Sequence, residues 1–219
     1  MRVLISLLIA LSFCGCQPQY SDFFAYHDDG TPKPYVALVP VIDETHEKLP
    51  MDLAPEFSKQ IRYLLMREGK LFLPPEKEVK NRLTDSSKQE LLSTTDLMPY
   101  LHFQPAHFVV VLELIEHKEI PYQRGKIKPI YTAHLDPDNA NVLQMKMRLR
   151  VVDIRGGEPR LIRQEVLESN HVIPKKAVQD SIDLKDKEAF SSTPLGLAYA
   201  RFERDIARKI EQITSYQKP

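Results

Sequence analysis

The chain has 219 residues, and its 30 lysines and arginines balance its 30 aspartates and glutamates, so its formal net charge at pH 7 is zero. A protein that binds nucleic acid through phosphate contacts needs a basic excess, so this balance argues against nucleic acid as a partner. The length and the 42% share of hydrophobic residues suit one domain with a substantial core.

The first stretch of the chain has the pattern of a signal peptide. Arg2 places a positive charge at the N-terminus, and Val3 to Phe13 form an apolar run that only Ser6 and Ser12 interrupt. This run of eleven residues is too short for a membrane-spanning helix, which needs about 20 apolar residues. Its length is typical of the hydrophobic core of a signal peptide, which we predict over residues 1–15.

The residues that end this run, Phe13-Cys14-Gly15-Cys16, resemble the lipobox of bacterial lipoproteins. In that family the bond before the cysteine is cut, and the new N-terminal cysteine carries acyl chains. The resemblance implies cleavage between Gly15 and Cys16 and lipidation of Cys16, although Phe13 stands where leucine is commonest. A cut before Cys14 is rejected, because it would place the bulky Phe13 where a small residue is required. The alternatives are an ordinary secretory signal that is cut elsewhere and a transmembrane anchor.

Lipidation would attach the protein permanently to a membrane, with its domain in the periplasm. Each buried CH₂ group of an acyl chain contributes about 0.8 kcal/mol, and more than one chain makes anchoring stable. The lipoprotein resemblance implies the outer membrane, because Gln17 replaces the aspartate that holds such proteins at the inner membrane. Cys14 would leave with the signal peptide and Cys16 would be blocked. The mature domain would then have no cysteine nucleophile, thiol redox site or cysteine zinc site.

Residues 16–34 are predicted to form the lipidated N-terminus and a tether, and residues 35–219 the periplasmic domain. The tether contains three prolines and a polar turn, Asp28-Asp29-Gly30-Thr31. Its length limits its reach to about 60 Å, so the domain stays near its membrane. Phe23, Phe24 and Tyr26 are apolar for a free linker, and we expect them to pack on the domain or to contact the bilayer interface.

The first half of the domain combines a buried strand with helices. Tyr35–Ile42 is apolar and β-branched, as in a strand that is buried on both faces. A helix is predicted between Asp52, as its N-cap, and Gly69, because apolar residues recur between them at helical spacing. Three shorter elements are predicted to follow: a strand at Lys70–Leu73 and helices at Glu76–Leu83 and Ser86–Leu92.

Strands dominate the second half. The apolar run Phe108–Ile115 predicts a third strand. Val142–Ile154 alternates apolar and polar side chains with strict period two, which predicts a strand with one buried face. Arg155-Gly156-Gly157-Glu158 predicts a hairpin turn that leads to a partner strand at Arg160–Glu168. His117–Asn141 reads as a polar segment without a strand of its own.

A long helix is predicted to close the chain. Val172–Thr193 is expected to be irregular, and Thr193 and Pro194 have the residue types of an N-cap and a first helical residue. An apolar stripe follows them to Ile213. The order of elements predicts an α/β (α+β) fold, with a single mixed sheet and helices packed on it.

The sequence contains no recognisable catalytic or metal-binding motif. Its seven histidines are scattered, and none forms the i, i+4 pair or the His-Glu-x-x-His of a zinc helix. Asp136–Asn141 begins like a calcium loop but has Ala140 in place of an oxygen ligand and no glycine at the turn, so a plain loop is favoured. We therefore predict no catalytic residue, no metal and no cofactor. A metal site built from distant histidines and acids is the alternative.

Two sets of charged residues lie in the predicted strands. Glu113 and Glu116 are three positions apart, so without a bulge they point to opposite faces and cannot act as a carboxylate pair. Lys146, Arg148 and Arg150 alternate along one strand and share one face. That face is a candidate surface for an anion or a protein partner, and the alternative is an ordinary solvated face.

The strand pattern resembles small periplasmic lipoprotein domains. The segment VALVPV at residues 36–41, the strand FVVVLELIE at residues 108–116 and the signature Val152-Asp153-Ile154-Arg155-Gly156-Gly157-Glu158 carry the resemblance. Together with the lipobox and the closing helix, they are similar to the TolB N-terminal domain, the curli-export lipoprotein CsgG and the LpoB-type activators of peptidoglycan synthases. The resemblance covers Tyr35 to Tyr216. It implies a protein that binds other proteins or assembles, and not an enzyme.

Three functions follow from these observations. The first is a non-catalytic lipoprotein whose domain binds another envelope protein, in envelope assembly or in support of cell-wall synthesis. The second is a subunit of an export pore or ring of the curli-export kind, for which the proline-rich His117–Asn141 is poor material for a barrel wall. The third is an enzyme whose site forms only in the folded chain. The first is our prediction and the others are its alternatives.

Overall fold

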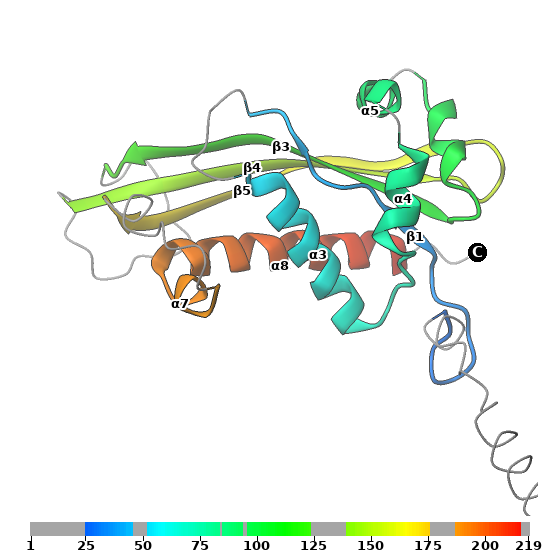
Figure 1. Cartoon of the computed structure of the whole chain (residues 1–219), viewed down its shortest axis with the longest axis horizontal. Helices are drawn as coiled ribbons and strands as arrows, with labels where there is room; N and C mark the ends of the chain where they lie inside the picture. Colours follow the sequence, from blue (N-terminus) through cyan, green and yellow to red (C-terminus); the bar gives the residue numbers. More distant parts are fainter. Residues whose placement is uncertain are drawn as a thin grey trace, which may run out of the picture.

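The computed structural model describes residues 25–45, 52–83, 85–93, 96–123, 139–175 and 187–215. They form a mixed β-sheet with helices on both faces, which confirms the predicted α+β fold (Figure 1). The strands are β1 (Val36–Leu38), β2 (Ile42–Asp43), β3 (Phe108–Pro121), β4 (Ala140–Asp153) and β5 (Arg160–Pro174). The helices are α3 (Leu53–Glu68), α4 (Glu76–Arg82), α5 (Asp85–Leu92), the 3₁₀ helix η1 (Met98–Phe103), α7 (Lys187–Ser191) and α8 (Pro194–Ser215).

Strand β3 lies inside the sheet and pairs along both of its edges. β1 and β2 follow each other along one edge and both run parallel to β3. The other edge of β3 pairs with β4, and β4 pairs with β5, both in antiparallel orientation. Parallel pairing of β1 with β3 requires a crossover connection, and the segment that carries α3, α4, α5 and η1 supplies it. The single strand predicted at Tyr35–Ile42 is present as the two short strands β1 and β2.

The period-two pattern of β4 is confirmed by its burial. The alternating apolar side chains from Leu143 to Val151 are all fully buried. Burial of one such side chain contributes about 1.5–3 kcal/mol, so this row alone fixes the register of the strand. The polar residues between them point to the other face of the sheet.

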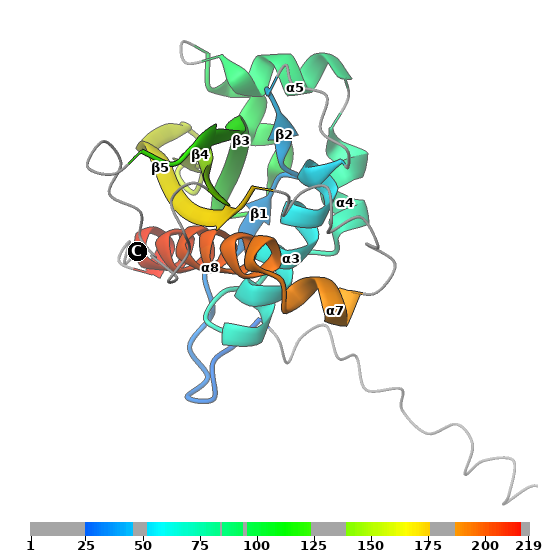
Figure 2. The ribbon, with the colours of Figure 1, turned by 90° about the vertical axis from the view of Figure 1, so that its left-hand side faces the viewer.

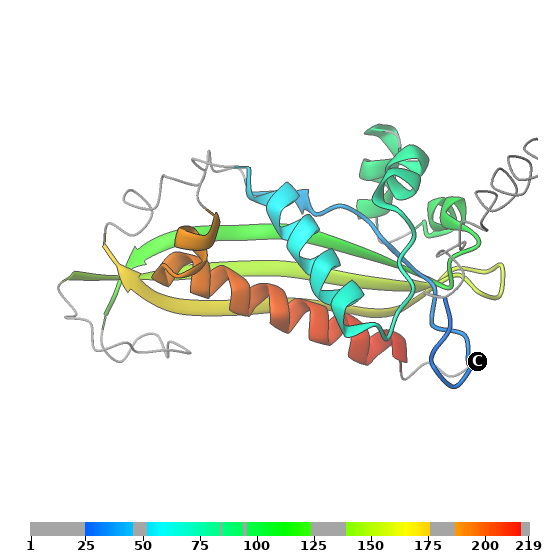
Figure 3. The ribbon, with the colours of Figure 1, turned by 60° about the horizontal axis from the view of Figure 1, so that its bottom comes forward.

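Helices cover the two faces of the sheet unequally. α3 and α8 lie across one face, which we call the α8 face (Figures 2 and 3). Phe57 of α3 contacts both Tyr199 and Phe202 of α8 edge-on, at ring-centroid distances of 5.5 and 6.1 Å. On the opposite face α4, α5 and η1 pack only on the end of the sheet near the β4–β5 turn (Figure 1). The rest of that face carries the charged side chains described below.

The helix ends agree closely with the predicted capping residues. Gly69 ends α3 with a φ of 68°, and its N–H donates to the carbonyl of Leu65 at 3.3 Å. Asp52 stands at the N-cap of α3, but its side chain makes no capping hydrogen bond. Thr193 caps α8, since its Oγ1 accepts a hydrogen bond from the N–H of Gly196 at 3.0 Å, and Pro194 is the first helical residue.

The structure corrects the predicted extent of three strands. β3 continues to Pro121 and β5 to Pro174, where the sequence predicted ends at Ile115 and Glu168. Both extensions pair with β4, and in β3 the charged side chains of Glu116 and Glu119 contact Lys146 and Asn141 of β4. Lys70–Leu73 is not a strand, because only a single bridge joins Phe72 to Tyr35. The segment from Val172, predicted to be irregular, holds the end of β5 and the short helix α7.

The last ten residues of the predicted tether are folded. Tyr26 forms a bridge with Pro32, and the N–H of His27 donates to the carbonyl of Thr31 at 2.8 Å. The Asp29 carboxylate accepts hydrogen bonds from the backbone and side chain of Thr31, and these bonds lower its pKa. Residues 1–24 lie outside the described residues, and so do residues 136–138 of the calcium-like loop. The signal peptide, the cleavage site and Cys16 therefore stay predictions.

The β4–β5 turn allows a direct test of its two glycines. Gly157 has a φ of 76°, a left-handed conformation that L-residues avoid, whereas Gly156 is not in that region. A methyl group would meet nothing within 4 Å at either position. We expect Gly157→Ala to lower the free energy of unfolding by about 1 kcal/mol, and Gly156→Ala to change it much less. Urea denaturation of both variants measures the difference in their free energies of unfolding. An equal loss in both variants would show that the left-handed conformation of Gly157 does not cause the loss.

Candidate partner surface

The three predicted surface cations all lie in β4, on the face opposite α8, but they have different environments. The side chains of Lys146 and Arg148 are 30% and 37% exposed, whereas that of Arg150 is 1% exposed. The shared face that their spacing predicted is therefore correct. Only Lys146 and Arg148 can contact a partner, because Arg150 lies beneath α5.

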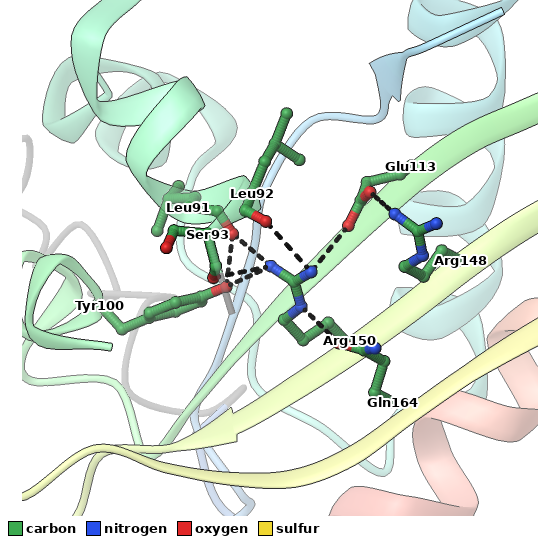
Figure 4. A network of polar contacts seen from close by, with 8 residues as sticks. All are labelled: Leu91, Leu92, Ser93, Tyr100, Glu113, Arg148, Arg150 and Gln164. Carbon is green, nitrogen blue, oxygen red and sulfur yellow. Dashed lines mark hydrogen bonds and ion pairs between the residues drawn. The ribbon is translucent and has the colours of Figure 1, made fainter. Parts of the chain in front are cut away.

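Arg150 connects the sheet to the last turn of α5 (Figure 4). Its Nη1 donates to the carbonyl of Leu91 at 2.5 Å, and weaker contacts reach the carbonyls of Leu92 and Ser93 at 3.4 Å. These carbonyls lack partners inside a helix end, and a cation there also interacts favourably with the helix dipole. The hydroxyl of Tyr100 in η1 donates to the same Leu91 carbonyl at 2.8 Å. One side chain of β4 thus holds α5 and η1 in place.

Glu113 of β3 supplies the negative charge that this buried guanidinium needs. The Glu113 carboxylate lies 3.4 Å from Arg150 and 2.6 Å from Arg148, and its side chain is only 2% exposed. A buried charge is tolerated when it is paired and hydrogen-bonded. From the sequence, Glu113 was considered only as a partner of Glu116 in a carboxylate pair, so its role as the counter-ion of Arg150 was missed.

A β-bulge corrects the prediction for Glu113 and Glu116. The register between β3 and β4 shifts between Leu114 and Glu116, so that Glu113 lies opposite Arg148 and Glu116 opposite Lys146. The two carboxylates therefore share a face, because β3 contains the bulge in whose absence opposite faces were predicted. Lys118 and Lys146 form ion pairs with Glu116, the second at 2.7 Å. Hydrogen bonds from these two lysines lower the pKa of Glu116, so it is an ionised partner and not a general acid.

These strands present a charged surface next to α5, which we call the ladder surface. Its exposed and partly exposed members come from β3, β4 and β5: Lys118, Glu116, Lys146, Arg148, Val166 and Glu168. Opposite charges face each other across the strands where Glu116 and Glu168 flank Lys146. Val166 is 49% exposed and lies directly opposite Arg148. An exposed apolar side chain among fixed charges is suited to protein recognition, because the charges set orientation and the apolar group supplies burial.

The buried His117 contacts a tyrosine of α8. The Nε2 of His117 lies 2.9 Å from the hydroxyl of Tyr199, and burial lowers the pKa of His117 to about 4. This pair is enclosed between β3 and α8, where His117 is 5% exposed. Across the described ranges, no group of three or more His, Cys, Asp or Glu side chains could hold a metal ion. His46 and His134 lie outside these ranges.

A hollow of about 510 Å³ lies where the segment that follows the Tyr26–Pro32 bridge meets the sheet. It is lined by the segments 32–34 and 104–108 together with Ile154 and Arg155. The Arg155 guanidinium stacks over the ring of Phe108 at 4.8 Å and pairs with Asp153 at 2.7 Å. Asp153 thus balances the charge of Arg155, and nothing in the lining has the arrangement of a nucleophile with a base.

No helix within the described part of the chain combines the length and the apolar character that a membrane crossing needs. The model of a family described as "Family of unknown function (DUF7499)" matches residues 22–217, which is most of the chain. No curated protein matches the sequence.

Solved structures resemble the fold. The hypothetical protein CT253 from Chlamydia trachomatis is 26% identical, with a TM-score of 0.64, over 83% of this chain and 98% of that chain. The lipoprotein GNA1162 from Neisseria meningitidis is 11% identical, with a TM-score of 0.39, over 72% of this chain and 98% of that chain. The LpoB C-terminal domain from Salmonella enterica is 22% identical, with a TM-score of 0.29, over 69% of this chain and 93% of that chain. The TM-scores of the last two are too low to support conclusions about this protein.

Proposed function

The chain belongs to the DUF7499 family, a family of unknown function, and we propose that it is a non-catalytic, lipid-anchored envelope protein whose domain binds another envelope protein. The observation that carries this proposal is the ladder surface, an array of charges on three adjacent strands that includes the exposed Val166. The sequence Phe13-Cys14-Gly15-Cys16 supports the lipid anchor at Cys16, and Gln17 supports the outer membrane. The domain then faces the periplasm.

The chemistry of the ladder surface favours recognition over catalysis. Glu116 is paired with Lys118 and Lys146, and their hydrogen bonds lower its pKa, so it is not held neutral to deliver a proton. Exposed ion pairs contribute only about 0–1 kcal/mol to stability. A partner can therefore rearrange them at little cost, and complementary charges then increase the association rate and the specificity of binding. Val166, opposite Arg148, provides the apolar contact.

A photo-crosslinking amino acid at Val166 tests the proposal in intact cells. Leu197 of α8 is the matched control, because it is 50% exposed and lies on the helix that packs on the other face of the sheet. We expect an adduct with one dominant envelope protein from position 166 and none of that adduct from position 197. Mass spectrometry of the adduct identifies the partner.

Charge reversal on the same surface provides the second arm. Lys118→Glu with Glu168→Lys keeps the net charge and reverses the charge at one partly exposed and one exposed position, so the charge pattern of the surface is lost. The adduct from position 166 should weaken strongly in this background. Equal yields of the adduct from positions 166 and 197 would contradict the ladder surface as the binding site. So would an adduct from position 166 whose yield is unchanged by the charge reversal. A series of crosslinked oligomers of the protein itself would instead support the ring or pore alternative.

A further inference from the structure

A second concave region lies on the α8 face, between β5 and α8. This hollow has a volume of about 270 Å³ and is lined by His171, Arg201, Arg204, Asp205 and Arg208. Figure 3 shows α8 running alongside β5. The ladder surface lies on the other face of the sheet. The inference from this hollow is therefore independent of the proposed function.

The lining of the hollow carries an excess of positive charge. Three guanidinium groups and one carboxylate give it a formal charge of +2, in a chain whose total charge is zero. Arg201, Arg204 and Arg208 are spaced i, i+3 and i+7, which places them along one side of α8. Asp205 lies 3.6 Å from Arg208, and both side chains are largely exposed, so solvent screens this pair. The Nε of Arg204 donates to the carbonyl of Ala200 at 3.0 Å, which orients its guanidinium.

His171 adds a buried polar group to the wall formed by β5. Its side chain is 4% exposed, and its Nε2 lies 2.6 Å from the hydroxyl of Ser169. Burial, followed by the charge of Arg201, lowers the pKa of His171, so the imidazole is neutral at pH 7. A neutral imidazole offers hydrogen bonding without adding a fourth positive charge. The site thus combines cations on the helix with a fixed polar group on the strand.

We propose that this hollow binds a phosphate group, either as a free phosphate ester or in a lipid headgroup. The planar fork of arginine matches the geometry of phosphate oxygens and binds them in pairs. A phosphate monoester carries a charge of about −1.5 to −2 at pH 7, which complements the charge of the lining. The hollow also has room for a small substituent beyond the phosphate itself.

Thermal unfolding of the full chain in neutral detergent micelles tests this site. Inorganic phosphate is the first probe, added at constant ionic strength, and far-UV circular dichroism follows unfolding. We expect the Tm to rise by about 4 °C when phosphate exceeds its Kd tenfold. Arg204→Gln with Arg208→Gln should weaken phosphate binding at least about tenfold, because two charge-assisted contacts are lost. The rise in Tm should then fall to about 1 °C or less at the same phosphate concentration.

A second double variant controls for the loss of charge. Arg67→Gln with Arg160→Gln also removes two exposed arginines that lie beside acidic residues, at positions far from the hollow in the sequence. Its Tm should respond to phosphate as the original protein does. Equal responses in all three proteins, or no response in any, would overturn the proposal.

Micelles that contain phosphatidylglycerol distinguish the two sources of phosphate. If a lipid headgroup occupies the hollow, these micelles should raise the Tm and abolish the further effect of inorganic phosphate, whereas phosphatidylcholine should not. If free phosphate esters are the ligand, the response to inorganic phosphate should persist in both kinds of micelle. Either result requires the Arg204 and Arg208 guanidiniums. A lipid effect that survives their replacement counts against the site.

Discussion

Replacing Arg150 with alanine is expected to lower the free energy of unfolding by about 3–5 kcal/mol, the range for breaking a buried ion pair. The Arg150 side chain is 1% exposed and lies between Glu113, Tyr100 and the carbonyls at the end of α5. Its removal leaves the Glu113 carboxylate in the interior without its buried counter-ion. The last carbonyls of α5 lose their donor at the same time. Urea denaturation measures the cost, and hydrogen exchange over residues 85–92 should report that α5 detaches first.

Arg148→Ala is the matched control for this prediction. Arg148 contacts the same carboxylate at 2.6 Å, a shorter distance than the 3.4 Å from Glu113 to Arg150. The Arg148 side chain is 37% exposed, so water replaces much of the lost interaction, and the expected cost is only about 1 kcal/mol. If both variants lower the free energy of unfolding equally, the burial of Arg150 would not be what determines its contribution to stability. Arg150→Lys should recover only part of the loss, because an ammonium lacks the planar fork that spans these carbonyls.

Comparison of Arg148 with Arg150 shows where the sequence stops being informative. Both arginines belong to the same period-two pattern, which correctly predicted their strand and their common face. The burial of Arg150 depends on α5, a helix about sixty residues earlier in the chain, and strand periodicity contains no information about that contact. The same limit applies to Glu116, whose face is set by a bulge that no residue type at Leu114 or Ile115 signals.

Local signals, by contrast, predicted local structure well. Gly69 ends α3, and Thr193 with Pro194 begins α8, because capping depends on the backbone preferences of one or two residues. The far end of β3 was missed because Glu116, Lys118 and Glu119 look like loop residues in sequence. In the sheet these charges are paired, Glu116 with Lys146 and Glu119 with Asn141 at 3.0 Å. The pairing partners lie more than twenty residues away, so composition alone pointed to a loop.

Replacing Cys16 with alanine is expected to release the protein from the membrane. The lipobox resemblance makes this cysteine the acceptor of the acyl chains, and each buried CH₂ group of those chains contributes about 0.8 kcal/mol to anchoring. The described domain begins downstream of this residue, so its stability should not change. Metabolic labelling with a tagged fatty acid, followed by separation of membrane and soluble fractions, measures both the acylation and the release.

Cys14→Ala is the control that distinguishes the lipobox from a simple effect of cysteine loss. Residue 14 would leave with the signal peptide, and alanine is small, so labelling and membrane attachment should persist in this variant. Label that remains on Cys16→Ala, or label that is lost from Cys14→Ala, would contradict cleavage between Gly15 and Cys16. If neither variant nor the original chain takes up label, the first fifteen residues act as an ordinary secretory signal. The domain would then reach its partner by diffusion, and the ladder surface would have to supply all of the binding energy that a membrane anchor otherwise assists.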